Sequence, residues 1–69
     1  MAFNPSPQVA AARDFAKQFG KDIVIICHVQ ESPEGIEVGY ASYGKDPARC
    51  NLGKKLGDIA YDAILKGLT

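Results

Sequence analysis

The sequence lacks any excess of charge, because eight lysine and arginine residues balance eight aspartate and glutamate residues. A chain without net charge has no overall field to attract it to nucleic acid or to an anionic membrane, so an electrostatic partner must use a local patch. Long apolar runs are also lacking, since the longest, Ile23 to Cys27, has five residues, whereas about 18 are needed to span a bilayer. The N-terminus has neither the basic segment nor the apolar core of a secretion signal. We therefore expect a cytoplasmic protein without a membrane partner.

Cysteine and histidine are too scarce for most metal sites and nucleophilic active sites. The chain has two cysteines and one histidine, without the Cys-x-x-Cys or His-x3-His spacing of a zinc site. Cys27 and His28 are neighbours in an expected strand, so their side chains should point to opposite faces. A pair of Cys50 with His28 would lack an obvious group to orient the base. Without a secretion signal both cysteines should stay reduced, and we expect no metal, no cofactor and no enzymatic activity.

The small size of the chain limits its stability. With 69 residues, of which 46% are hydrophobic and 23% charged, the chain has the composition of one globular domain, spanning residues 1–69. Domains this short gain only about 3 to 5 kcal/mol from a single core unless a disulfide, metal or partner subunit contributes. Because cysteine and histidine are scarce, a partner subunit is the source of additional stability that remains for this chain.

The first element should be a helix that begins within residues 4–7. Asn4 or Ser6 can cap its free amides, and a proline follows each of them at the first helical position. Gly20 can end the helix in a left-handed conformation. The expected buried stripe, at spacings of three and four residues, is Val9, Ala12, Phe15, Ala16 and Phe19.

Two β-strands should follow and form an antiparallel hairpin. Residues 22–29 are rich in β-branched side chains and predict the first strand, and residues 36–43 predict the second. Between them, residues 30–35 predict a loop longer than the tightest hairpin turns. Both faces of the first strand are mostly apolar, with Val24, Ile26 and His28 on one of them. Both faces therefore need cover.

The last element should be a helix from Pro47 to about Lys66, capped by Asp46. Gly53 and Gly57 lie inside it, where each glycine costs about 1 kcal/mol relative to alanine. We expect this cost to be offset by close approach of the first helix, through Ala12 and Ala16, or of the same helix in a second subunit; the alternative is a groove for a ligand. The expected buried stripe is Leu52, Leu56, Ile59, Ala60, Ala63, Ile64 and Leu68.

A basic segment at the start of this helix is the best indication of ligand binding. Helix N-termini favour anions, and aromatic side chains can stack on the bases of single strands. The alternative is a solvated helix face, which the neutral total charge favours. The candidate residues for anion or nucleic-acid binding are Lys45, Arg49, Lys54 and Lys55, with Tyr40 and Tyr43 just upstream.

The stretches at residues 4–19 and 38–45, together with Cys50 and the helical segment at 58–61, resemble small uncharacterised proteins encoded by bacteriophages and prophages. The resemblance covers most of the chain. It implies a phage or prophage origin and a location in the host cytosol. Such proteins have no assigned activity, so the resemblance implies no site residue.

The sequence thus predicts an α+β domain of helix, antiparallel hairpin and helix (αββα), with its sheet extended by dimerisation. Our first hypothesis is a non-enzymatic interaction protein that acts as a homodimer, because a two-stranded hairpin is marginal alone and its free edge can pair with a second copy. A nucleic-acid or phosphate-binding module and an antagonist of a host protein are the alternatives. The candidate residues of the oligomer interface are Val24, Ile26, His28, Gly53 and Gly57.

Overall fold

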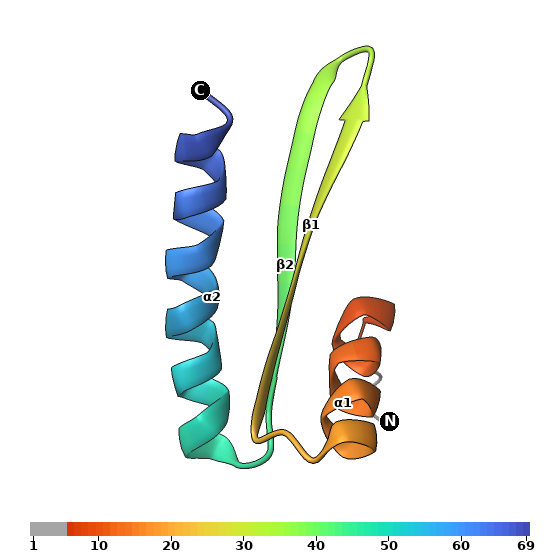
Figure 1. Ribbon diagram of the computed structural model, residues 1–69, viewed down its shortest axis with the longest axis vertical. Coiled ribbons are helices and arrows are strands. Elements are labelled where there is room, and N and C mark those ends of the chain that lie inside the picture. Colours follow the sequence, from red (N-terminus) through yellow and green to blue (C-terminus); the bar gives the residue numbers. More distant parts are fainter. Residues whose placement is uncertain (1–5) are drawn as a thin grey trace.

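A β-hairpin lies between two helices in the computed structural model, which describes residues 6–69 (Figure 1). The order along the chain confirms the predicted α+β arrangement of helix, hairpin and helix. Helix α2 and strand β1 run in the same direction, because each is antiparallel to β2 (Figure 1). The elements are α1 (Pro7–Phe19), β1 (Ile23–Ser32), β2 (Gly35–Gly44) and α2 (Pro47–Gly67).

The ends of α1 follow the predicted local signals. Ser6 caps the helix, its hydroxyl oxygen accepting from the Val9 amide at 3.3 Å, and Pro7 occupies the first position. Gly20 ends the helix in the left-handed region, with φ at 64°. The alternative start at Asn4 and Pro5 lies outside the described residues.

The hairpin is longer and its turn tighter than the sequence predicted. Strand β1 continues through Ser32, which pairs with Gly35, so only Pro33 and Glu34 form the turn. The predicted loop at residues 30–35 is therefore wrong. Polar residues in this stretch are typical of a loop, but at an exposed hairpin end they still form the backbone ladder. Gly35, the first residue after the turn, has φ at 139°, a conformation that other residues rarely adopt.

The two helices cover opposite faces of the hairpin and do not contact each other (Figure 1). Helix α1 places Ala12 and Ala16 against Val24, with Ile26 and Tyr43 packed around them. Residues paired across an antiparallel ladder share a face, and Val24 pairs with Tyr43 and Ile26 with Ala41. This face therefore belongs to α1.

The opposite face belongs to α2, whose two inner glycines lie against the hairpin. A Cβ atom on Gly53 would meet Ile23 and Ser42, and one on Gly57 would meet the ring of Tyr40. The predicted approach of these glycines to Ala12 and Ala16 is therefore wrong, because the whole hairpin separates the two helices. The glycines do serve a close approach, but their neighbour is the sheet.

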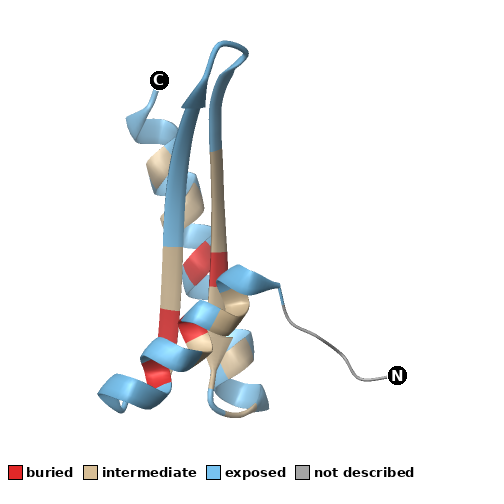
Figure 2. Cartoon of the chain, turned by 90° about the vertical axis from the view of Figure 1, so that its right-hand side faces the viewer, coloured by how far each residue is buried: buried red, intermediate tan, exposed pale blue. Residues whose placement is uncertain are grey.

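The buried interior consists of small residues, while many large apolar side chains are exposed. Ala12, Ala16, Val24 and Ala41 are buried, together with the two glycines of α2. The buried residues of the hairpin lie toward the end where the strands connect to α1 and α2. The end with the turn is exposed (Figure 2). The predicted buried stripes are therefore only partly right. The exposed large apolar residues are Phe15, Phe19, Val29, Ile36, Leu52, Leu56, Ile59, Leu65 and Leu68.

Within residues 6–69, neither helix combines the length and the apolar character that crossing a membrane requires.

Candidate interaction site

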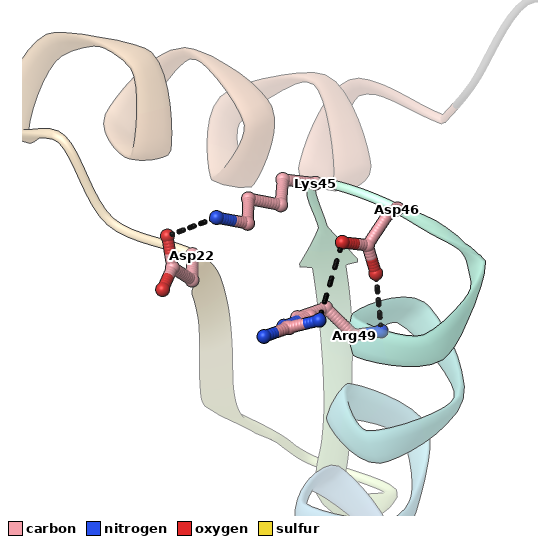
Figure 3. Close-up of polar contacts among 4 residues, drawn as sticks. All are labelled: Asp22, Lys45, Asp46 and Arg49. Atoms are coloured by element: carbon pink, nitrogen blue, oxygen red, sulfur yellow. Dashed lines mark hydrogen bonds and ion pairs between the residues drawn. The ribbon is translucent and has the colours of Figure 1, made fainter.

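Two of the four predicted basic residues pair with aspartates of the same chain. Lys45 forms an ion pair with Asp22 at 3.1 Å, and Arg49 forms one with Asp46 at 3.4 Å (Figure 3). Asp46 also caps α2, since its carboxylate accepts from the Arg49 amide at 2.8 Å. These contacts connect the beginning of α2 with the beginning of β1. They also neutralise positive charges that an anionic ligand would need.

The other predicted binding residues do not gather on one surface. Tyr40 and Tyr43 are three positions apart in β2, so they lie on opposite faces of the hairpin, under α2 and α1 respectively. Lys54 and Lys55 are exposed on α2, away from Tyr43. The structure therefore does not bring the two tyrosines and the four cations together as one stacking and phosphate-binding platform.

Tyr40 has a structural contact that sequence reasoning missed. Its hydroxyl donates a hydrogen bond to the carboxylate of Asp58, and it lies 3.5 Å from the carbonyl oxygen of Lys54. The bond to Asp58, with partial burial and the nearby negative charge, raises the pKa of Tyr40. Gly57 next to Asp58 was the available signal, because a glycine inside a helix leaves room for a large ring from the neighbouring strand.

Most of the predicted interface residues are used inside the chain. Val24 is buried beneath α1, Ile26 is half-buried beside it, and Gly53 and Gly57 are buried beneath α2. His28 is exposed, with its imidazole lying across Gly39 on the paired strand. Of the five candidates, only His28 can therefore meet a partner without repacking of the chain.

An exposed apolar stripe runs along α2 instead. Leu52, Leu56, Ile59 and Ala63 follow one another at intervals of four, three and four residues, which places them on one side of a helix with about 3.6 residues per turn. All four are exposed. Arg49 and Lys66 continue the same spacing at the two ends, so charged side chains bound the stripe. We call these four residues the α2 stripe.

The α2 stripe lies on the side of α2 that is nearer β1. Around the helix, Gly53 contacts both strands through Ile23 and Ser42, whereas Gly57 and Asp58 contact Tyr40 of β2. At about 100° per residue, the stripe is on the side of Gly53 that is opposite to Asp58. The α2 stripe therefore lies beside Gly53, on the side of the helix that is nearer β1.

Strand β1 has further exposed apolar side chains on the same side of the hairpin as the α2 stripe. Cys27 and Val29 share the face that α2 covers, because they pair with Tyr40 and Val38, and both are exposed. Among the described residues the sheet has only two strands, so the outer edge of β1 has no strand partner. The α2 stripe, Cys27, Val29 and this edge lie on the same side of the hairpin, and together we take them as the candidate interaction site.

Other features of the described chain offer less chemistry. No group of three metal-ligating side chains lies together within residues 6–69. A hollow of about 330 Å³ at the hairpin turn is lined by Ser32, Glu34, Gly35, Ile36 and Glu37. The hollow is wide open to solvent. None of its lining residues carries a positive charge that could hold an anion, and the only groups that could act as a base beside its serine are carboxylates.

Comparisons of the chain with protein-family models, with curated proteins and with solved structures give no match. The fold and the site thus define a small αββα domain with an exposed apolar side.

Proposed function

We propose that the protein is a non-enzymatic interaction protein that works as a homodimer, in which the β1 strands of two copies pair edge to edge. The observation that carries the proposal is the exposed apolar side at the edge of β1, where Cys27 and Val29 have no cover among residues 6–69. Edge pairing would turn two marginal hairpins into one four-stranded antiparallel sheet.

A second copy is the occupant that this side fits best. An isologous contact uses the same patch on both subunits, and here the patch combines a strand edge with an apolar rim on the same side. An unprotected strand edge is a template for pairing with another strand, and proteins that avoid such pairing place charges or prolines along the edge. The β1 segment from Ile23 to Val29 contains neither a proline nor an acidic or lysine side chain.

The nucleic-acid or phosphate-binding alternative has less support. Lys45 and Arg49 are engaged by Asp22 and Asp46, and the two tyrosines lie on opposite faces of the hairpin. Following the resemblance to phage and prophage proteins, we assign the proposed homodimer to the host cytosol, where a host protein is the further partner to search for.

Sedimentation equilibrium at micromolar concentrations tests the proposal, and we expect a dimer. Val29→Lys should weaken the dimer at least about tenfold, because it places a charge in the centre of the interface. Ile36→Lys is the matched control, since Ile36 lies on the same face of the hairpin but on β2, and its exposed fraction of 51% is close to the 49% of Val29. A wild-type protein that stays monomeric over this range would refute the proposal.

A further inference from the structure

The hairpin has opposite charges at its two ends. Lys21 stands immediately before β1, at the end where the strands connect to the helices (Figure 1). The strands themselves contain no lysine or arginine. At the other end, around the turn, lie the glutamates Glu31, Glu34 and Glu37, which are exposed, as Lys21 is. We call residues 31–37 the acidic turn end.

These charges are not used inside the described chain. Within residues 6–69, neither Lys21 nor any glutamate of the acidic turn end forms an ion pair. Asp22, the neighbour of Lys21, is held by Lys45 at 3.1 Å, so Asp22 does not neutralise Lys21. Lys21 and the acidic turn end therefore remain available to a partner, and each carries the charge that is complementary to the other.

We propose that in the homodimer Lys21 of each copy lies against the acidic turn end of the other copy, with the two β1 strands antiparallel. This inference rests on the proposed homodimer and adds the surface that meets the partner's turn, the direction of the paired strands and a dependence of the dimer on salt. A second copy is the occupant because antiparallel pairing of two identical strands brings the start of each beside the end of the other.

Edge pairing through the apolar part of β1 brings these charges together. The apolar residues of β1 lie within 23–29, so pairing this stretch with its copy puts the two-fold axis near Cys27. Lys21 is six residues before Cys27, and it therefore falls beside Pro33 of the partner subunit, six residues after it. Moving the axis by one residue shifts this position by two, which keeps Lys21 beside residues 31–35. The contact is thus the same for neighbouring registers.

The positions of the helices leave room for this pairing. The two helices cover opposite faces of the hairpin, and both contact it more through β2 than through β1. Among the described residues the outer edge of β1 has no strand partner, and a neighbouring strand needs about 4.8 Å in the plane of the sheet. A second β1 strand can therefore approach in that plane, and no contact between the helices of the two copies is required.

The charges also disfavour the parallel arrangement. Parallel pairing of two β1 strands would place the two acidic turn ends side by side and would bring the two Lys21 side chains together. Like charges opposite each other on neighbouring strands are destabilising. Antiparallel pairing instead puts opposite charges next to each other at both ends of the interface, and charge complementarity of this kind fixes the register more than it adds affinity.

Charge reversal with a matched control tests the contact. Lys21→Glu and Lys55→Glu change the net charge equally, and neither lysine has an ion pair within residues 6–69. Lys55 lies on the side of α2 that is turned away from the sheet. In sedimentation equilibrium at low salt, Lys21→Glu should raise the dissociation constant about threefold to tenfold, and Lys55→Glu should leave it within about twofold. The effect of Lys21→Glu should vanish near 1 M salt, where the screening length is about 3 Å. Circular dichroism checks that both variants fold.

Mixtures of variants test the register. Lys21→Glu and Glu31→Lys each place like charges at both ends of their own homodimer, whereas their heterodimer restores opposite charges at both ends. The heterodimer should therefore form in preference to either homodimer. A mixture of Lys55→Glu with Glu31→Lys has the same net charges but restores only one of the two contacts, so its heterodimer should be less enriched. Native mass spectrometry, with one variant isotope-labelled, measures the proportions.

The possible failures are distinguishable. A monomeric wild type overturns the proposed homodimer and this inference with it. A dimeric wild type in which Lys21→Glu acts like Lys55→Glu, or in which the effect of Lys21→Glu persists at high salt, leaves the homodimer standing and overturns the contact of Lys21 with the acidic turn end. Equal enrichment of the heterodimer in the two mixtures also overturns this contact, because it shows that only net charge matters.

Discussion

The hydroxyl of Tyr40 in the middle of β2 donates a hydrogen bond to the carboxylate of Asp58 in the middle of α2. The ring of Tyr40 crosses beneath Gly57 to reach that carboxylate, and it lies 6.1 Å from the ring of Tyr61. A strand side chain thus contacts the helix on its β2 flank, and the α2 stripe is left exposed on the β1 flank.

The bond between Tyr40 and Asp58 predicts a loss of stability at alkaline pH. The folded protein raises the pKa of Tyr40 above its ordinary value of 10.0, so the folded state favours the protonated hydroxyl. This stability is fully present below the ordinary pKa and is lost as the pH rises through the raised one. Thermal unfolding of wild type and Tyr40→Phe should show a lower melting temperature for the variant at neutral pH and a smaller difference above the raised pKa. A constant difference across that range would contradict the role of the hydroxyl.

The two inner glycines of α2 should respond oppositely to alanine. A Cβ on Gly53 meets its nearest atoms at 3.4 to 3.8 Å, so Gly53→Ala should fit and stabilise the protein by up to about 1 kcal/mol through helix propensity. A Cβ on Gly57 would collide with the Tyr40 ring, so Gly57→Ala should destabilise it by about 1 to 3 kcal/mol. Denaturant midpoints measure both effects. Equal effects of the two substitutions would show that the ring moves aside freely.

The cap of α2 should contribute measurably to stability. Asp46→Ala removes the acceptor for the Arg49 amide and should cost about 0.5 to 2 kcal/mol in the free energy of unfolding. Asp46→Asn keeps a capping oxygen and loses only the exposed ion pair with Arg49, so its cost should be smaller. Urea unfolding at low and high salt separates the two contributions, because only the ion pair is screened. A larger loss in Asp46→Asn than in Asp46→Ala would contradict this assignment.

The proposed dimer places the two copies of Cys27 near its two-fold axis. Cys27 and Val29 are the exposed apolar residues of β1 on the face that α2 covers, so a dimer that pairs these positions has its axis at or next to Cys27. Antiparallel neighbours have Cα atoms about 4.5 to 5.5 Å apart, within the range that a disulfide spans. A mild oxidant should therefore link Cys50→Ser into covalent dimers and should not link Cys27→Ser, as non-reducing electrophoresis would reveal. Linkage through Cys50 alone would contradict the register.

Features of the fold that depend on neighbouring residues were predictable from the sequence. The caps at Ser6 and Asp46 and the stop at Gly20 act within one turn of chain, and β-branched residues between Ile23 and Val29 favour a strand without help from distant contacts. The polar end of β1 was not predicted, because residues 30–32 have the composition of a loop and form a strand only through their pairing with residues 35–37.

The candidate site was less predictable, because apolar spacing does not say which side of a helix is covered. Leu52, Leu56 and Ile59 have the pattern of a buried stripe, yet they are exposed, and the buried side of α2 is made by Gly53 and Gly57. The side of α2 with Gly53 and Gly57 was predicted to approach another helix, and its packing on the hairpin and on Tyr40 was not predicted, because glycine carries no hydropathy signal that names its neighbour.

The sequence by itself determined the class and order of the elements, because capping, turn formation and β-propensity are local properties of the chain. Only the tertiary structure decided that the two helices cover opposite faces of the hairpin and that α2 turns its larger apolar side outward. The physical reason is steric. The Tyr40 ring leaves room only for glycine at position 57 of α2, so the side of the helix with the small residues packs on the sheet and the larger apolar side chains remain on the outside.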